Sequence, residues 1–300
     1  ENHFSFTGKQ NMSSSLPLHS QHQRTYHDNK FVYPVLSRRS KGISIGINLN
    51  PDKICNFDCI YCQVDRREES ETRFVGTEQL MQELDHMLKF VLSGEIYQDP
   101  KFSEVPAELR RLNDIAFSGD GEPTTYRNFD QIVKQVAALK RKHSASDVKM
   151  VLISNASMFH RASTQAALAI FDENQGEIWA KLDAGTEEYF KTIDRTKIRF
   201  SQVLDNLHLA AEQRPIVIQS LFMLVNQQPP SNEEIDAYCS RLNEIVQAGG
   251  QIKLVQVYTI ARRTAEEYVA SLSTTQVDEI AHKVAEQTKL PVEVYYGNAD

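Results

Sequence analysis

Long hydrophobic runs are absent from this sequence. The longest apolar stretch, residues 216–225, is about ten residues long and contains Gln219 and Ser220, whereas a helix that crosses a membrane needs about 20 apolar residues. The N-terminus also lacks a basic segment followed by an apolar one and small residues, which is the pattern of a secretory signal. The sequence therefore predicts a cytoplasmic protein with no membrane span.

An excess of basic residues is also lacking. Lys and Arg together number 33 against 40 Asp and Glu, which gives a net charge of −7. Since binding to nucleic-acid phosphates needs a broad basic surface, nucleic acid is the less favoured partner, and a small-molecule or peptide substrate is favoured. Between residues 24 and 41, however, one acidic residue, Asp28, faces five basic ones: Arg24, Lys30, Arg38, Arg39 and Lys41. Such a stretch is ordinarily a solvated surface, and the alternative is an anchor for an anionic substrate.

Cysteine is scarce, but three of the four cysteines are close together. Cys55, Cys59 and Cys62 form a C-x-x-x-C-x-x-C pattern, here called the cysteine loop (residues 55–62). Three neighbouring thiols would leave one unpaired in a disulfide scheme, and a chain of 300 residues can build its own core without disulfides. A metal site is therefore indicated. Cys239 stands alone in a helical pattern and is expected to be a small core residue.

Two kinds of metal site fit three thiolates from one turn. A closed zinc site would need a fourth ligand, for which His19, His22 and His27 are the candidates. A [4Fe-4S] cluster held by three cysteines would keep one iron open, which suits a site where the cluster also binds a substrate.

Hydrophobic periodicity predicts an α/β fold. Short β-rich runs alternate with helical patterns from Gly42 onward, which is typical of a parallel sheet. A capping box, Ser231 with Glu234, is expected to open one helix. Six βα units predict an open (β/α)6 partial barrel at residues 41–300, preceded by an extended N-terminal segment at residues 1–40. The expected strands are 43–48, 113–118, 149–154, 177–183, 216–222, 252–257 and 292–295.

Several polar groups follow directly on these strands, where parallel βα folds place their active sites. After the second strand comes Gly119-Asp-Gly-Glu122, which lacks the third glycine of a dinucleotide fingerprint. Gly119 and Gly121 would let backbone carbonyls approach a ligand, and Glu122 would offer a negative charge to an ammonium group. The alternative is a tight turn with a surface glutamate.

The later strands end in further candidates. Asn155 can bond a ribose hydroxyl or a carboxylate, or it can cap the next helix. Lys181 and Asp183 share one face of a strand, as a cation for a carboxylate and an acceptor for ribose, or as a simple ion pair. The remaining candidates are Gln219, a polar residue in a buried strand; Val257 and Tyr258, which can pack on adenine; and Arg262 and Arg263, which can meet an anionic substrate.

The cysteine loop, with Tyr61 before its last cysteine and a strand-like run before its first, resembles the signature of the radical S-adenosylmethionine (radical SAM) superfamily. The surrounding residues 37–66 resemble the branch of wyosine-type iron–sulfur oxidoreductases, and this closer similarity extends from about Pro34 to Arg262. The resemblance implies a partial barrel whose [4Fe-4S] cluster is bound by Cys55, Cys59 and Cys62. It also implies S-adenosylmethionine (SAM) as a second cofactor, with the segment 119–122 at its amino group, although Asp120 replaces the glycine usual in the middle.

The resemblance further implies a reaction. A one-electron donor of the flavodoxin or ferredoxin type reduces the cluster, SAM is cleaved, and a 5′-deoxyadenosyl radical abstracts hydrogen from a small-molecule or peptide substrate. Tyr61, within the motif, is counted with the cofactor-binding residues. One alternative is modification of a tRNA base, although the sequence shows neither a flavodoxin-like domain nor a second cysteine cluster. The other is a zinc-stabilised binding module without catalysis.

Overall fold

The computed structural model describes residues 26–37, 39, 41–66 and 68–297. Eight strands form one sheet in the order β1-β2-β3-β4-β5-β6-β8-β10, and all neighbours are parallel except β1 and β2. The strands are β1 (Val32–Ser37), β2 (Gly42–Ile47), β3 (Leu112–Phe117), β4 (Lys149–Ser154), β5 (Gly176–Lys181), β6 (Ile216–Leu221), β8 (Ile252–Tyr258) and β10 (Val292–Tyr295).

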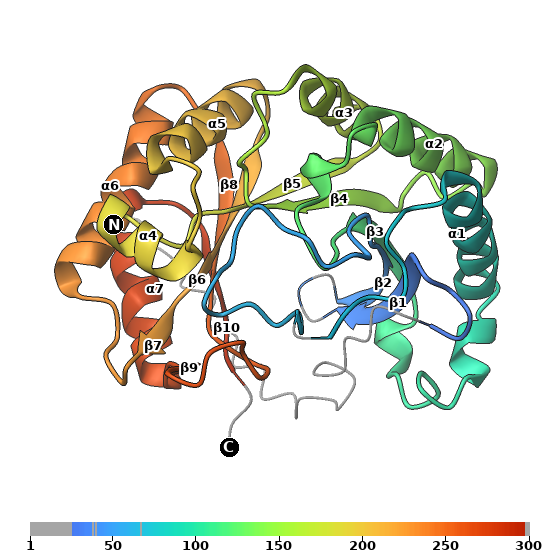
Figure 1. Ribbon diagram of the computed structural model, residues 1–300, viewed down its shortest axis with the longest axis horizontal. Coiled ribbons are helices and arrows are strands. Elements are labelled where there is room, and N and C mark those ends of the chain that lie inside the picture. Colours follow the sequence, from blue (N-terminus) through green and yellow to red (C-terminus); the bar gives the residue numbers. More distant parts are fainter. Residues whose placement is uncertain (1–25, 38, 40, 67, 298–300) are drawn as a thin grey trace, which may run out of the picture.

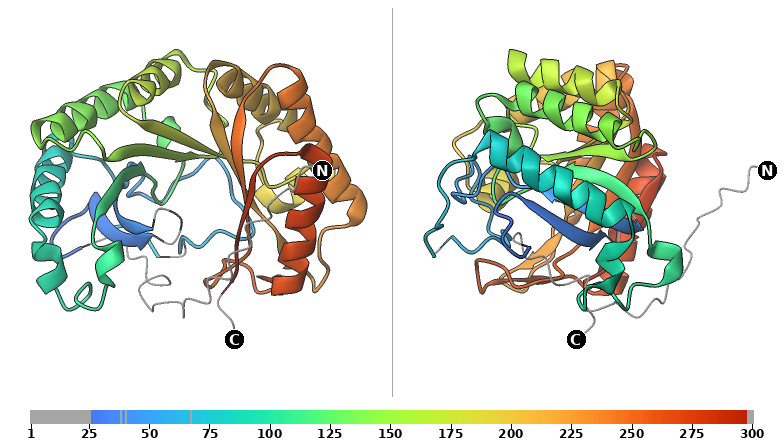
Figure 2. Two further views of the ribbon diagram at one scale, coloured as in Figure 1. Left: turned by 180° about the vertical axis from the view of Figure 1, so that it is seen from behind. Right: turned by 90° about the vertical axis from the view of Figure 1, so that its right-hand side faces the viewer.

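The helices lie on the outer, convex side of this curved sheet (Figures 1 and 2). They are α1 (Thr77–Leu92), α2 (Phe129–Lys142), α3 (Ala162–Asp172), α4 (Glu187–Asp194), α5 (Phe200–Gln213), α6 (Asn232–Gln247) and α7 (Thr274–Thr288). Three short 3-10 helices are η2 (Glu95–Gln98), η3 (Ala107–Leu109) and η4 (Pro123–Thr125), and β7 (Met223–Val225) pairs with β9 (Val269–Ser271) in a small second sheet. Six βα units, each running from a parallel strand into its helix, lead to β10, so the predicted open (β/α)6 partial barrel is confirmed. No helix within the described ranges is long and apolar enough to cross a membrane.

One local detail of the helices differs from expectation. Ser231 does cap α6, because its hydroxyl accepts from the backbone N–H of Glu234. The reciprocal half of the capping box is missing, since the Glu234 carboxylate accepts hydrogen bonds from Gly185 and Thr186 instead. Glu234 therefore ties the start of α6 to the start of α4.

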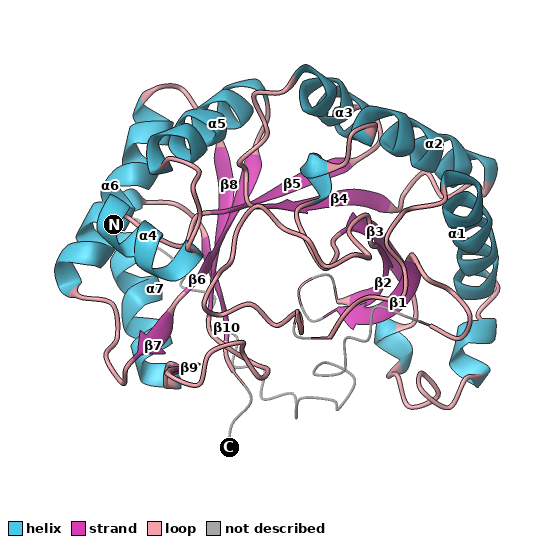
Figure 3. Ribbon diagram, in the orientation of Figure 1, coloured by secondary structure: helices cyan, strands magenta, loops and turns pink. Residues whose placement is uncertain are grey.

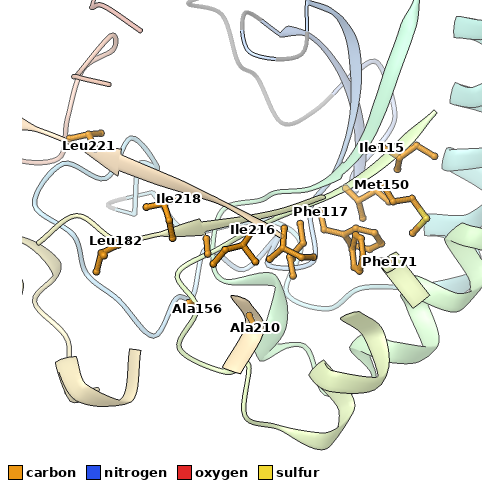
Figure 4. Packing of buried hydrophobic residues seen from close by; sticks show 14 of the residues in the cluster. Ile115, Phe117, Met150, Ala156, Phe171, Leu182, Ala210, Ile216, Ile218 and Leu221 are labelled. Atoms are coloured by element: carbon orange, nitrogen blue, oxygen red, sulfur yellow. The ribbon is translucent and has the colours of Figure 1, made fainter. Parts of the chain in front are cut away.

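The main core lies between the sheet and the helices. Alternate strand residues point outward, and Figure 4 shows Phe117 of β3 and Met150 of β4 beside Phe171 of α3. The rings of Phe117 and Phe171 are 5.5 Å apart, edge to face. Cys239 of α6 is buried in this core, as expected for a small apolar residue.

A second, smaller set of apolar residues packs together on the concave side: Ala116, Val151, Trp179 and Val217. Glu177 lies beside this set and accepts hydrogen bonds of 2.7 Å from both Lys149 and Lys253 and one of 3.0 Å from the Trp179 indole. Glu177 therefore joins β5 to β4 and β8 near the amino ends of these strands.

The sheet has two free ends, because β1 and β10 do not pair with each other among the described residues. Strand β1 is an addition to the seven expected strands, and it pairs with β2 from Val32↔Ile47 to Ser37↔Gly42. Arg39, in the turn after β1, reaches across to the other end, with its guanidinium 4.3 Å from the ring centre of Tyr258 and 5.5 Å from that of Tyr295. Of the predicted N-terminal segment 1–40, residues 1–25, 38 and 40 lie outside the described residues.

Candidate functional site

One cavity of about 370 Å³ opens at the carboxyl ends of the parallel strands. The described residues between β2 and α1, which include the cysteine loop, form neither helix nor strand, and this long loop crosses the concave side of the sheet (Figure 3). Of the thirteen residues predicted to bind the cluster or a cofactor, twelve line this cavity: Cys55, Cys59, Tyr61, Cys62, Gly119, Gly121, Glu122, Asn155, Lys181, Asp183, Gln219 and Tyr258.

The three thiols are free and half-buried in this cavity. Burial raises the pKa of Cys55, while the Phe57 N–H and the positive charge of Arg66 act in the opposite direction. Burial and the nearby Asp194 raise the pKa of Cys59 well above its ordinary value. Its thiol donates to the Asp194 carboxylate at 3.3 Å.

The cysteine loop is fixed by the chain segment that ends α4. The backbone N–H groups of Asp58 and Ile60 donate to the carbonyls of Asp194 and Ile193 at 3.1 and 2.8 Å. The hydroxyl of Thr196 donates to the Asn56 carbonyl at 2.8 Å, and Arg195 Nε donates to the Asp58 carbonyl at 2.7 Å. Such bonds hold the loop that carries the thiols in one conformation.

The Gly119–Glu122 turn packs directly on the chain that leads into the cysteine loop. A Cβ at Gly119 would lie 2.4 Å from Asn48 Oδ1, and one at Gly121 would lie 2.2 Å from the Ile54 carbonyl oxygen. The atoms that leave no room for a Cβ at these two positions therefore belong to the protein itself. Sequence reasoning assigned these glycines to the approach of a ligand.

Glu122 is buried, which differs from the alternative of a surface glutamate. Its carboxylate accepts hydrogen bonds from the Thr124 N–H and hydroxyl, from the Ser154 hydroxyl at 2.7 Å and from the Asn155 N–H at 2.7 Å. Burial raises the pKa of Glu122, and these hydrogen bonds oppose the rise. The carboxylate thus joins the loops that follow β3 and β4 while it adds negative charge to the cavity wall.

Asn155 is connected to the cysteine loop. Its side-chain amide donates to Asn56 Oδ1 at 2.9 Å, and its own oxygen accepts from the Ser157 N–H at 3.1 Å. The next helix, α3, begins at Ala162 with Arg161 at its N-cap. The alternative that Asn155 caps this helix is therefore wrong.

Lys181 and Asp183 form a buried network with Tyr61. Lys181 Nζ donates to the Tyr61 hydroxyl at 2.7 Å and lies 3.4 Å from an Asp183 oxygen, so the simple ion pair is present. The Tyr61 hydroxyl donates to Asp183, whose other oxygen accepts from the Leu221 N–H at 2.7 Å. Burial and the neighbouring Asp183 raise the pKa of Asp194 to about 7. The Lys181 side chain lines the cavity and is 22% exposed.

Of the pair Val257 and Tyr258, only Tyr258 faces the cavity. Val257 is fully buried in the core between the sheet and the helices, because successive residues of a strand point to opposite faces. The prediction that Val257 packs on a ligand does not agree with this placement. Gln219 faces the cavity and donates to Gln256 at 2.7 Å, and Arg262 also lines the cavity whereas Arg263 does not.

Sequence reasoning missed several residues of the site. Asp194 and Thr196 hold the cysteine loop, Asn56 of that loop bonds Ser157, and Arg66 lines the cavity. Arg39 also lines the cavity, and it belongs to the basic stretch 24–41 for which an anchor of an anionic substrate was one of the two predicted roles. For Asp194 and Thr196, the one sequence signal is that residues 194–196 form a polar run at the end of a helical pattern. No spacing rule connects Asp194 with Cys59, which lies 135 residues earlier.

The side chains around the cavity fit an iron–sulfur cluster better than a closed zinc site. Within the described ranges, no three His, Cys, Asp or Glu side chains converge so that they could hold a single metal ion. His27 bonds Asp99 at 3.2 Å and does not line the cavity, while His19 and His22 lie outside the described residues. A [4Fe-4S] cluster distributes its thiolate ligands over separate irons, so three thiols around one cavity fit it without converging on a point.

Searches against curated proteins found distant relatives. A Brachyspira hyodysenteriae protein named GTPase Obg is 26% identical over 82% of this chain and 32% of its own length. UPF0026 proteins of Helicobacter pylori and Methanocaldococcus jannaschii are 27% and 28% identical over 54% of this chain and 45% and 43% of their own lengths. The chain thus spans less than half of the length of these relatives.

Among solved structures, TYW1 with a bound lysine–pyruvate adduct matches with a TM-score of 0.49 and 15% identity, over 87% of this chain and 78% of that one. Archaeal TYW1 matches with a TM-score of 0.44 and 14% identity, over 82% and 72%. The family model of the radical SAM superfamily matches residues 49–229, which include the cysteine loop and the strands β3 to β6. This match covers more than half of the chain, and the chain therefore belongs to the radical SAM superfamily of iron–sulfur enzymes, which use a [4Fe-4S] cluster and SAM.

Proposed function

We propose that this chain cleaves SAM reductively and uses the resulting 5′-deoxyadenosyl radical to abstract hydrogen from a small-molecule or peptide substrate. The observation that carries the proposal is the convergence of the three cysteine thiols, the Gly119–Glu122 turn and Lys181 on one cavity. We assign Cys55, Cys59 and Cys62 as the cluster ligands. When bound and reduced, the cluster supplies the electron for cleavage of the SAM sulfonium.

The other residues of the cavity have roles that follow from their charges. Lys181 offers an ammonium to the SAM carboxylate, which suits a charge-assisted hydrogen bond. Because the oxygens of Glu122 are engaged within the protein, we assign the SAM amino group to the backbone of the Gly119–Gly121 turn, with Glu122 supplying negative charge behind it. Gln219 and Tyr258 line the wall on the side of β6 and β8.

A single experiment tests the proposal. The protein is reconstituted anaerobically with iron and sulfide, dithionite and SAM are added, and 5′-deoxyadenosine is measured by mass spectrometry. Formation of 5′-deoxyadenosine is expected in the wild type. Replacement of Cys59 by alanine is expected to abolish both the cluster and the cleavage. A [4Fe-4S] cluster with one open iron needs three thiolate ligands, and this loop has no fourth cysteine to replace Cys59.

Cys239→Ala is the matched control. Cys239 is buried in α6, apart from the cavity, so this variant should keep its iron content and SAM cleavage. Equal loss in both cysteine variants would contradict the assignment of the ligands. A protein that binds zinc alone would contradict the proposed function as a whole.

The choice of substrate class needs a separate measurement. The net charge of −7 favours a small molecule or peptide over tRNA. We expect tRNA binding to be weak and insensitive to salt. Affinity that falls by orders of magnitude between about 50 and 200 mM salt would instead support modification of a tRNA base.

A further inference from the structure

Arg39 lies in the cavity wall at the open side of the sheet. It belongs to the basic stretch 24–41, for which the sequence predicts either a solvated surface or an anchor for an anionic substrate. Lys30 and Lys41, the other basic residues of this stretch that the structure describes, are exposed and do not line the cavity. Arg39 is half-buried and does line it. The structure therefore singles out Arg39 as the candidate anchor among the described residues of the stretch.

The guanidinium of Arg39 is held by its face. It lies 4.3 Å from the ring centre of Tyr258 and 5.5 Å from that of Tyr295, and these two tyrosines are paired in register on β8 and β10. Stacking on aromatic rings uses the face of a guanidinium, whereas its N–H donors lie in the plane and stay available. Arg39 forms neither a hydrogen bond nor an ion pair with any described residue. Its nitrogens also remain accessible to solvent, so an entering group can reach them.

A second available donor lies beside Arg39. Tyr258 lines the cavity, and its hydroxyl makes no hydrogen bond within the part of the chain that the structure describes. This hydroxyl is accessible as well. The hydroxyl of the neighbouring Tyr295, by contrast, donates to Glu293 at 2.6 Å. Two side chains in van der Waals contact thus offer hydrogen-bond donors to the cavity, and one of the two is a cation.

These donors lie apart from Lys181, the residue assigned to the SAM carboxylate. Lys181 of β5 pairs with Gln219 of β6, which in turn pairs with Gln256 of β8. Tyr258 lies two residues beyond Gln256 and therefore on the same face of β8. Since neighbouring strands are about 4.8 Å apart, β8 lies about 10 Å from β5 across the sheet. Arg39 and Tyr258 therefore form a separate part of the same cavity, on the side of the open edge.

We propose that Arg39 and Tyr258 bind an oxyanion group of the substrate, a carboxylate or a phosphate, and so hold the substrate beside the SAM subsite. This inference rests on the proposed function, because it names the substrate class of the same site. A guanidinium donates two parallel hydrogen bonds to the oxygens of such a group, and the Tyr258 hydroxyl adds a third donor. An anchored substrate presents one particular hydrogen to the 5′-deoxyadenosyl radical.

The first test measures anion binding with two probes, inorganic phosphate and propionate. Each is titrated into the reconstituted protein with SAM bound and the cluster oxidised, and the affinity is measured by isothermal titration calorimetry. In protein labelled with 15N-arginine, nuclear magnetic resonance should show one side-chain N–H signal that shifts saturably with the anion. Arg39→Gln should lose this signal and weaken anion binding at least about tenfold, because hydrogen bonds to a charged group are lost.

The second test uses the two tyrosines. Tyr258→Phe keeps the ring on which Arg39 stacks and removes the hydroxyl alone, so anion affinity should fall about tenfold. Tyr295→Phe is the matched comparison, because its hydroxyl is already engaged by Glu293. Anion affinity in this variant should stay within about twofold of the wild type. Both changes keep an aromatic ring, so altered binding in Tyr258→Phe does not arise from a lost stack.

The outcomes separate the two proposals. Wild-type protein that forms no 5′-deoxyadenosine would overturn the proposed function and this inference with it. Protein that cleaves SAM but binds neither anion saturably, or binds it equally well in Arg39→Gln or in Tyr258→Phe, would overturn this inference alone.

Two further outcomes identify the group that is bound. Tighter binding of propionate would support a carboxylate substrate, and tighter binding of phosphate would support a phosphorylated one. An anion that SAM displaces, together with SAM affinity that falls in Arg39→Gln, would show that Arg39 serves the SAM carboxylate and would refute the substrate subsite.

Discussion

Polar side chains that line this cavity also form hydrogen bonds within the protein, and Glu122 is an example. The two oxygens of Glu122 accept from Thr124, in the connection after β3, and from Ser154 and Asn155, at the end of β4 and just after it. An amide can replace one of these oxygens, but its NH2 group would then face a backbone N–H. The residue is consequently expected to matter for the fold as well as for charge.

Glu122→Gln is predicted to lower the free energy of unfolding by about 2–3 kcal/mol, because buried donors lose a charged acceptor. Urea denaturation of the cofactor-free protein measures this change. Glu108→Gln, at an exposed position of η3, should leave the stability within about 0.5 kcal/mol of the wild type. Unchanged stability of Glu122→Gln would indicate that the carboxylate acts on a ligand only.

At the scale of elements, the site depends on how loops pack on one another. Thr196, after α4, and Asn155, after β4, both bond Asn56 of the cysteine loop. The Gly119–Glu122 turn, after β3, packs on Ile54 just before that loop. Two βα connections and the connection between α4 and α5 therefore determine the position of the three thiols.

Gly121→Ala tests this packing. The added Cβ would lie 2.2 Å from the Ile54 carbonyl and 2.9 Å from the Asn50 side chain, so the chain before Cys55 must move. We expect iron content after reconstitution to fall at least about twofold and the free energy of unfolding to fall by about 1–3 kcal/mol. In Gly76→Ala the nearest atom would be 3.7 Å away, and this control should retain its iron. Full iron content in Gly121→Ala would show that the turn does not hold the loop.

The base of the barrel contains a second link between elements. Glu177 of β5 binds Lys149 of β4 and Lys253 of β8. Burial alone would raise the pKa of Glu177, but hydrogen bonds from both lysines and Trp179 hold it at about 2. A carboxyl group with a lowered pKa stabilises the fold above its unfolded pKa, and that contribution disappears as the pH falls toward the folded pKa.

Glu177→Gln is accordingly predicted to cost about 2 kcal/mol at pH 7, as expected for hydrogen bonds between charged groups. The difference in stability from the wild type should shrink as the pH falls from about 4.5 to about 2. Urea denaturation at pH 7 and pH 3 measures it. A difference of equal size at both values would contradict the assignment to the ionised carboxylate.

For the molecule as a whole, the defining feature is a barrel that stays open between β1 and β10. In Figure 1 these strands lie on either side of the gap in the sheet. Arg39 spans this opening by stacking on Tyr258 and Tyr295, so the two ends of the sheet are connected by side chains in place of backbone hydrogen bonds. A cation–π contact of this kind contributes about 0.5–1 kcal/mol at an exposed site.

Arg39→Gln is predicted to increase local opening of β10. Loss of about 0.5–1 kcal/mol corresponds to amide exchange that is about two- to fivefold faster. Hydrogen–deuterium exchange of peptides covering residues 292–297 measures it, with Arg73→Gln as a control on the surface. Equal exchange in Arg39→Gln and the wild type would show that the stacking does not hold the open side together.

The sequence by itself determined the features that are local in the chain. Short β-rich runs between helical patterns predicted all seven parallel strands, and the spacing of Cys55, Cys59 and Cys62 indicated the metal chemistry, because neighbouring residues carry each of these signals. Strand β1 was missed, since its pairing with β2 depends on the fold and the segment before Gly42 lacks a clear period. Val257 was misplaced because one step along a strand exchanges its two faces.

Only the tertiary structure decided which distant residues surround the thiols. Asp194 lies beside Cys59 because α4 ends over the cysteine loop. Glu122 meets Asn155 because β3 and β4 are parallel neighbours whose carboxyl ends coincide. Such contacts arise when the βα units assemble into the partial barrel, and no local pattern of residues encodes them.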